Sequence, residues 1–340
     1  MKIMVDLFKI LLLSFSFGII SIQFSPIYSH VIELEQYIFN RGEEDVNPIS
    51  NYIDKNEESK NNKIQYQIIE EGNNEEKQIN DLNENNELGK NYIHNFFTNG
   101  TFISSWGTKG EEEGKFLHPH GIAVDSKGNV FVTDEEKSNV QKFDKNGSFI
   151  LSWGESGKGP NDEFGKRIED VNVDHNGNVF VVDYSNEKIM KFDPNGTFIT
   201  SWGSEGDKAG EFDRAWGIAF DSENNVHTSE RWGLRIQKFD NDGNFIKMFG
   251  KEGSDDGEFK HLHAIAIDSN DNIYANDEEN GNIQKFNKDG KFLKSWGNVG
   301  KGEGEFDEPH GMAIDSKDNL YVVDTQNNRI QVFSPDGKYI

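Results

Sequence analysis

The sequence contains no cysteine in its 340 residues. Disulfide bonds, thiolate zinc sites of the finger or ribbon type and cysteine nucleophiles are therefore excluded. A metal ion bound by this chain has to be held by histidine, carboxylate or tyrosine side chains.

Basic residues are also scarce, because 35 Lys and Arg stand against 60 Asp and Glu and give a formal net charge of -25. A strongly acidic chain repels phosphate backbones and anionic lipid headgroups. We therefore expect no nucleic-acid partner.

Hydrophobic residues make up only 34% of the chain and charged residues 28%, which is too polar for one core that fills the whole length. We expect part of the chain to stay unpacked. What is abundant is glycine, with 34 residues, together with 26 Phe and 6 Trp. Many turns that alternate with short aromatic strands are typical of an all-β structure.

Long apolar runs are absent except at the start, where Leu7 to Phe24 follows Lys2. This pattern predicts that residues 1–29 are a signal peptide or a membrane anchor. The expected location is extracellular or at the cell surface, with a possible membrane tether through this segment.

Residues 30–91 are rich in Asn and Glu, and residues 31–95 hold 15 acidic and 6 basic side chains. Such a segment buries too little apolar surface to offset the entropy of ordering it. We expect a disordered linker, in which two apolar patches, 31–39 and 64–69, form at most transient helix or strand.

The remainder of the chain is an internal repeat. Five copies align on the aspartate that ends each GIAVD-like segment, with spacings of 49, 47, 47 and 47 residues: Asp125, Asp174, Asp221, Asp268 and Asp315. Each copy contains four short apolar strands, and an Asn-Gly or Asp-Gly pair supplies the tight turn before the last strand. A four-stranded meander of this period is one blade of a β-propeller.

The motifs P-x-G-I-A-V-D, G-N-V-F-V-T-D, N-x-I-Q-x-F and G-x-F-x-x-x-W-G resemble the NHL repeat, and the resemblance covers residues 92–340. NHL propellers usually have six blades. Residues 92–107 match only the last two strands of a repeat, and the fifth copy stops at Ile340 inside its fourth strand. We expect a six-bladed architecture that lacks the two inner strands of its opening half-blade; a five-bladed ring is the alternative.

The residue just before each inner strand should point toward the propeller axis, on the face where ligands bind. In the five copies these residues are His120, Glu169, Trp216, His263 and His310. His118 and His261 lie two positions earlier in their copies. Converging neutral imidazoles, with Glu169 as a carboxylate, suit zinc or another divalent cation.

The repeat is also similar to that of the peptidyl-hydroxyglycine amidating lyase, a resemblance that implies a zinc site at His120, His263 and His310. The lyase's arginine and tyrosine pair cannot be placed, and a Pro-His-Gly before an inner strand is common in NHL repeats without catalysis. Virginiamycin-type lyases share His-Gly at inner strands, but their ring has more blades than this chain supplies.

Other repeated residues are expected to be structural. The five aspartates of the alignment should bond to turn amides, and the repeated aromatics should fill the space between blades. Carboxylates end the second strand of every copy, and Arg235 and Arg329 stand five residues further on, as in surface hairpin ion pairs. Trp216 and Trp232 fall outside this set and are candidates for the ligand face.

Three Asn-x-Ser/Thr triplets begin at Asn99, Asn146 and Asn195 and are glycosylation candidates in an exported protein. The interpretation that we favour is an exported binding module for a protein, peptide or glycan. The alternative is a metal-dependent lyase. Ubiquitin ligase and RNA-regulator functions, known for other NHL proteins, conflict with the missing cysteines and the acidic charge.

Overall fold

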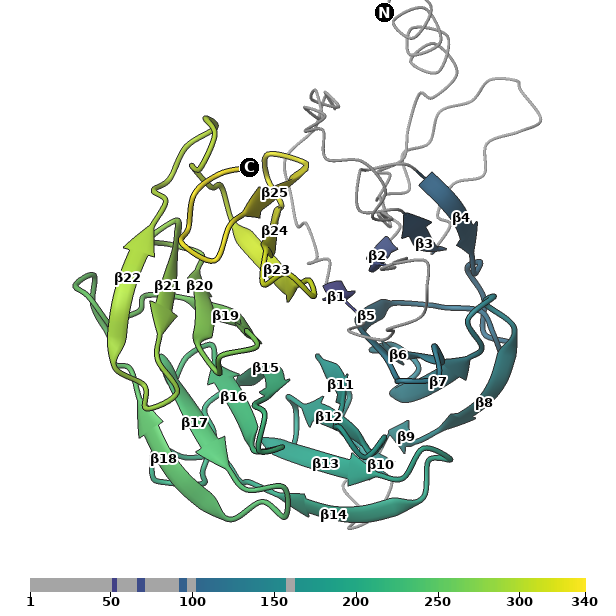
Figure 1. Cartoon of the computed structure of the whole chain (residues 1–340). Coiled ribbons are helices and arrows are strands. Elements are labelled where there is room, and N and C mark those ends of the chain that lie inside the picture. Colours follow the sequence, from purple (N-terminus) through teal and green to yellow (C-terminus); the bar gives the residue numbers. More distant parts are fainter. Residues whose placement is uncertain (1–50, 54–65, 71–91, 97–101, 157–162) are drawn as a thin grey trace, which may run out of the picture.

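The computed structural model describes residues 51–53, 66–70, 92–96, 102–156 and 163–340. Every regular element of these residues is a β-strand, and the sheets are arranged as blades around a central axis (Figure 1). Five sheets have four strands, one has three, and a short parallel pair links β9 to β10. This confirms the predicted all-β propeller of antiparallel blades.

Each blade is a meander of consecutive strands, ordered from the axis outward. Blade 1 contains β1 (Asn51–Ile53), β2 (Tyr66–Glu70), β3 (Tyr92–Phe96) and β4 (Phe102–Trp106). Blade 2 contains β5 (Pro119–Val124), β6 (Val130–Asp134), β7 (Asn139–Phe143) and β8 (Phe149–Trp153). The pair β9 (Glu155–Ser156) and β10 (Glu163–Phe164) precedes blade 3, which contains β11 (Val171–Val173), β12 (Val179–Asp183), β13 (Lys188–Phe192) and β14 (Phe198–Trp202).

The remaining blades follow the same order. Blade 4 contains β15 (Ala215–Phe220), β16 (Val226–Glu230), β17 (Arg235–Phe239) and β18 (Phe245–Phe249). Blade 5 contains β19 (Leu262–Ile267), β20 (Ile273–Asp277), β21 (Asn282–Phe286) and β22 (Phe292–Trp296). Blade 6 contains β23 (Pro309–Ile314), β24 (Leu320–Asp324) and β25 (Arg329–Phe333). Blade 6 has three strands, and a single antiparallel bridge pairs Phe333 with Tyr339, where the fourth strand is expected.

Blade 1 is complete, which corrects the expectation that its two inner strands are missing. β2 pairs with β3, with Tyr66 opposite Phe96, and β1 pairs with β2, with Asn51 opposite Ile68. Both strands come from the segment 30–91, so the expected linker does not hold for them. The average composition of a long polar segment conceals two strands of three and five residues. The rest of this segment and residues 1–29 lie outside the described residues.

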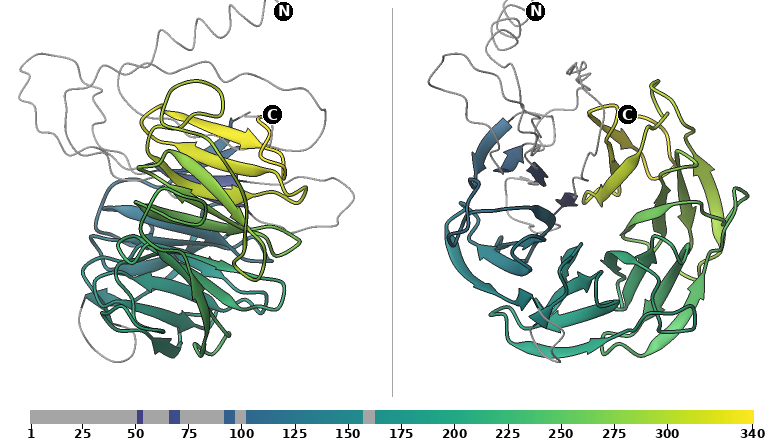
Figure 2. Two further views of the ribbon diagram at one scale, coloured as in Figure 1. Left: turned by 90° about the vertical axis from the view of Figure 1, so that its left-hand side faces the viewer. Right: turned by 180° about the vertical axis from the view of Figure 1, so that it is seen from behind.

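β1 also brings the two ends of the ring together. It lies between β5 of blade 2 and β23 of blade 6 (Figures 1 and 2). The alternative five-bladed ring is wrong, because β3 and β4 pair within their own blade.

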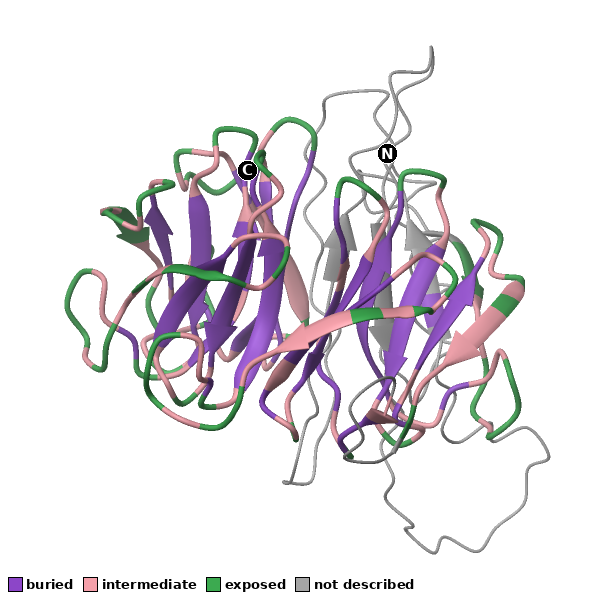
Figure 3. Cartoon of the chain, turned by 90° about the horizontal axis from the view of Figure 1, so that it is seen from below, coloured by how far each residue is buried: buried purple, intermediate pink, exposed green. Residues whose placement is uncertain are grey.

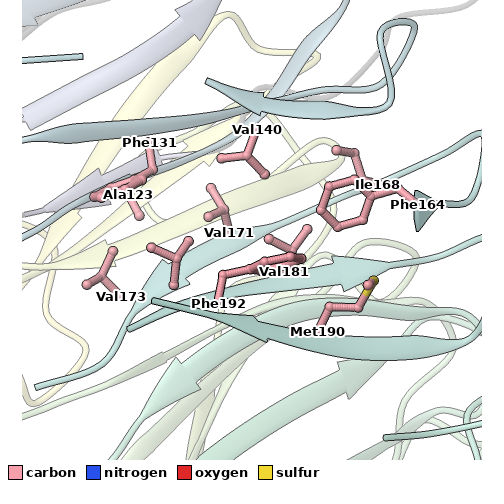
Figure 4. Packing of buried hydrophobic residues seen from close by; sticks show 11 residues of the cluster. Ala123, Phe131, Val140, Phe164, Ile168, Val171, Val173, Val181, Met190 and Phe192 are labelled. Atoms are coloured by element: carbon pink, nitrogen blue, oxygen red, sulfur yellow. The ribbon is translucent and has the colours of Figure 1, made fainter. Parts of the chain in front are cut away.

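Aromatic and aliphatic side chains fill the space between neighbouring blades, as predicted. In one such layer Phe131 of blade 2 packs with Phe164, Val171 and Phe192 (Figure 4). Trp153 borders this cluster. Figure 3 shows the consequence: the inner strands of blades 2 to 6 are largely buried, whereas exposed residues gather in the loops and on the outer strands. The ring is therefore held together by contacts between blades.

The hairpin glycines serve this packing. Gly243 has a φ of +88°, and a Cβ there would lie 2.5 Å from the ring of Trp202 in the preceding blade. Glycine is needed for both the left-handed turn and the close approach of the indole. Gly147, Gly196 and Gly337 meet the tryptophan of their preceding blade in the same way.

The repeated carboxylates are structural, again as predicted. Asp125 Oδ1 accepts the amides of Lys127 and Asn129 at 2.8 Å, and the other copies repeat this turn. Arg235 Nε lies 2.7 Å from Glu230 Oε1. This pair is buried, which corrects the expectation of a surface ion pair.

Within the described part of the chain, no helix has the length and apolarity that crossing a membrane requires.

Candidate functional site

The loops before the inner strands are fixed by the carboxylate that ends the second strand. Asp134 accepts the amides of Leu117 and His118 at 2.8 and 3.0 Å. Asp277 holds Lys260 and His261 in the same way, at 2.8 and 3.2 Å. The loop residues next to the axis therefore stand on a rigid framework.

The residues that this framework presents differ from copy to copy. They occupy three repeat positions: two residues before the pre-strand residue, the pre-strand residue itself, and the residue directly after the second strand. The residues two before the pre-strand residue are His118, Arg167, Arg214, His261 and Glu308. The pre-strand residues are His120, Glu169, Trp216, His263 and His310. The residues directly after the second strand are Glu135, Tyr184, Arg231, Glu278 and Thr325. Side chains from all three positions contact one another, so they form one face, called here the junction face.

One part of the junction face is a cluster of His261, His263, Glu278, Glu308 and His310, called here the histidine–glutamate cluster. Glu278 Oε2 lies 2.6 Å from His261 Nδ1 and 2.8 Å from His263 Nε2. His310 Nε2 lies 3.9 Å from Glu278 Oε1, and its ring centroid is 4.4 Å from that of His263. Two triplets, His261–His263–Glu278 and Glu278–Glu308–His310, bring their ligand atoms within 4.8 Å of one another.

The electrostatics of the cluster favour a neutral His263 beside an ionised Glu278. Burial lowers the pKa of His263 well below its ordinary value, and His310 beside it acts in the same direction. Burial alone would raise the pKa of Glu278, but the three histidines beside its carboxylate hold it well below its usual range. Neutral histidines and a carboxylate are the forms that bind a divalent cation.

A second part of the face contains His120, Glu169 and Arg167. His120 Nε2 lies 3.1 Å from Glu169 Oε2, and its Nδ1 lies 3.3 Å from the Glu169 carbonyl oxygen. Arg167 Nε contacts Glu169 Oε1 and lies 3.7 Å from Glu135 Oε1. Both ring nitrogens of His120 are thus engaged by Glu169.

Protonation of this pair follows from its burial. Burial raises the pKa of Glu169 to about 8, against the opposing charge of Arg167. Burial also lowers the pKa of His120 to about 3, and Arg167 adds to that effect. Near neutral pH Glu169 is therefore largely a carboxylic acid that lies beside the neutral imidazole of His120.

This pair predicts a specific pH dependence of stability for the Glu169→Gln variant. The pKa of Glu169 is about 8 in the folded protein, whereas its ordinary value is 4.5. The protonated group therefore contributes fully to the free energy of unfolding below pH 4.5, and this contribution is lost as the pH rises toward 8. Glutamine does not titrate. Urea unfolding should show that, between pH 6.5 and 8.0, the free energy of unfolding of the variant rises by about 2 kcal/mol relative to that of the parent. A constant difference between the two proteins would contradict the assignment.

Trp216 lies between the two parts and contacts both. Its ring stacks on His263 at a centroid distance of 4.7 Å and an angle of 29°, and it meets His120 edge-on at 5.8 Å. The guanidinium groups of Arg231 and Arg167 lie 4.6 and 5.3 Å from the ring centroid. The structure thus places Trp216 on the predicted ligand face.

Trp232 is 64% exposed and lies at the edge of the face, 6.5 Å from the ring of His261.

The predicted metal residues divide between the two parts. His263 and His310 meet at the histidine–glutamate cluster, whereas His120 and Glu169 pair with each other on the other side of Trp216. Sequence reasoning missed Glu278 and Glu308. Glu278 directly follows the second-strand carboxylate Asp277, so extending the repeat alignment by one residue would have found it.

The glycosylation candidates Asn146 and Asn195 are exposed on outer hairpins. Asn99 lies outside the described residues.

A family model described as DUF5128, 6-bladed beta-propeller, matches residues 69–202 and 270–340. No curated protein sequence gives a significant match.

Several solved structures share the fold. An inactive variant of virginiamycin B lyase from Staphylococcus aureus, solved with quinupristin, is 18% identical with a TM-score of 0.51, over 66% of this chain and 69% of that one. A gluconolactonase from Xanthomonas campestris is 13% identical with a TM-score of 0.53, over 71% and 77%. A Bacteroides caccae protein of unknown function is 10% identical with a TM-score of 0.55, over 73% and 88%.

At these identities the structural likeness shows the fold alone. The sequence match is to the propeller family, and the NHL character of the repeat stays an expectation. The match extends over more than half of the chain and begins inside β2, the strand that completes blade 1. The chain belongs to the 6-bladed beta-propeller family described as DUF5128.

Proposed function

We propose that this protein is an exported binding module that presents its junction face to a protein, peptide or glycan, with a divalent cation held in the histidine–glutamate cluster. The observation that carries the proposal is the convergence of His261, His263 and His310 on Glu278. The variable residues of the repeat gather on this face, while the rest of each blade repeats its framework. Export is supported by the apolar run from Leu7 to Phe24.

The side chains of the cluster fit a cation in number and in kind. His263 is fully buried, and its Nδ1 has no hydrogen-bond partner among the described residues. Imidazole nitrogen and carboxylate oxygen are the donors that zinc takes in sites without cysteine. Zinc is therefore the ion that we expect to bind best.

Metal analysis of the purified protein tests this proposal. The parent should take up one equivalent of zinc per chain, and His263→Ala should lose it, because that imidazole lies between His261 and His310. His227→Ala is the matched control, since His227 on β16 is equally buried but pairs with Asp221, outside the cluster. Zinc uptake that is the same in both variants, or absent from the parent, would refute the cation site.

A metal-dependent lyase is the second candidate, and the pair of His120 and Glu169 favours it. A buried carboxylic acid with a pKa of about 8 is a proton donor at neutral pH, and it lies on the same face as the cluster. In this interpretation a bound cation would polarise a substrate oxygen or bound water, while Glu169 would hold the proton.

A further inference from the structure

The charged side chain beside the cluster is Arg231, which follows β16 directly. Its guanidinium lies 4.6 Å from the centroid of Trp216, and its Nη2 lies 3.9 Å from Glu278 Oε2. Its Nε donates to His261 Nε2. Arg231 thus donates to one residue of the histidine–glutamate cluster and forms an ion pair with another.

These contacts define the tautomer of His261. Nδ1 lies 2.6 Å from Glu278 Oε2 and carries the proton of the neutral ring, because the other ring nitrogen is an acceptor. Nε2 accepts from Arg231, so it carries only a lone pair. His261 is a neutral ring between a carboxylate and a guanidinium.

A cation that binds His261 removes the acceptor of Arg231, whichever nitrogen it takes. At Nε2 the cation replaces the guanidinium directly. At Nδ1 it takes the lone pair of that atom, so the proton of the neutral ring resides on Nε2, where it faces the Arg231 Nε–H as a second donor. The cation also shares Glu278 and repels the positive guanidinium.

The resulting charge balance calls for an anion. With neutral histidines, Glu278 and Glu308 supply two negative charges, and a divalent cation with Arg231 supplies three positive charges. Glu308 is in addition held by the Gln326 amide, at 2.7 Å. One carboxylate restores neutrality and gives the released guanidinium a bidentate acceptor.

We propose that cation binding releases Arg231 from His261 and turns it toward a carboxylate of the ligand, so that cation and ligand bind cooperatively. Trp216 is buried, and Arg231 covers its ring. The ligand class is therefore a carboxylate with an apolar, planar part that takes the place on Trp216 that Arg231 leaves. This inference rests on the proposed cation site and names the ligand that completes it.

Calorimetry with zinc and benzoate tests the coupling, and benzamide serves as the neutral analogue. Benzoate should bind the zinc-loaded protein at least about tenfold more tightly than the zinc-free protein, whereas benzamide should show no such difference. Reciprocally, benzoate should tighten zinc binding by the same factor.

The Arg231→Gln variant separates this mechanism from a merely structural role. Without benzoate it should bind zinc several-fold more tightly than the parent, because the competing, repelling guanidinium is gone. With benzoate it should show no coupling. Lys247→Gln is the control, since Lys247 lies on the outer strand β18, 3.6 Å from Asp289 and outside the junction face, and should leave the coupling intact.

The outcomes distinguish this inference from the proposed function. If zinc does not bind the parent, both fail. If zinc binds but benzoate affinity is independent of zinc, or if Arg231→Gln keeps the coupling, only the role of Arg231 in binding a carboxylate is refuted. Melting curves of each variant confirm that the loss of coupling is not a loss of fold.

Discussion

Replacement of Glu278 by alanine should lower the affinity for zinc by about 100-fold or more. Glu278 belongs to both triplets of the histidine–glutamate cluster, and its Oε2 lies within 2.8 Å of two imidazole nitrogens. Loss of an outer hydrogen-bond partner alone weakens metal sites by about 10- to 100-fold, and a direct ligand should count for more. Competition with a zinc-sensitive dye would measure the change.

The adjacent residue supplies the control for that experiment. Glu279 has the same side chain but is exposed, so Glu279→Ala should bind zinc like the parent. Glu278→Gln, which keeps the shape and one acceptor oxygen, should fall between the parent and alanine. A Glu278→Ala protein with parental zinc affinity would place the cation elsewhere or nowhere on this face.

Removal of residues 1–71 should lower the melting temperature by about 10 °C or more. The deletion removes three residue pairs between β1 and β2 and five between β2 and β3, and it uncovers the buried inner strands β5 and β23. A hydrogen bond contributes about 1 kcal/mol, and each kcal/mol shifts the melting temperature of a domain of this size by about 2–4 °C. Differential scanning calorimetry would measure the effect.

A shorter deletion isolates the contribution of the two strands. A chain that begins at residue 45 keeps both β1 and β2 and should melt within a few degrees of the parent. If the two deletions melt alike, β1 and β2 add nothing to the ring, and blade 1 is held by β3 and β4 alone.

The sequence was sufficient to predict the blades because their determinants are local and repeated. Asp125 and its equivalents cap turns within four residues, and glycines such as Gly243 allow the left-handed hairpin. Apolar residues then pair strands that directly follow one another in the chain. The position of the junction residues follows from the same repeat, and it brought His263 and His310 to one face, as predicted.

Only the tertiary structure decided how the ring is completed and which residues of the face meet. β1 and β2 carry no repeat motif and gain their stability from β3, β5 and β23, contacts that the polar composition of residues 30–91 conceals. His120 and His263 likewise occupy the same position of the repeat. Their neighbours differ: Glu169 engages both nitrogens of His120, whereas Glu278 gathers His261, His263 and His310. A period places residues in a ring, but the side chains of adjacent blades determine which of them bind one another.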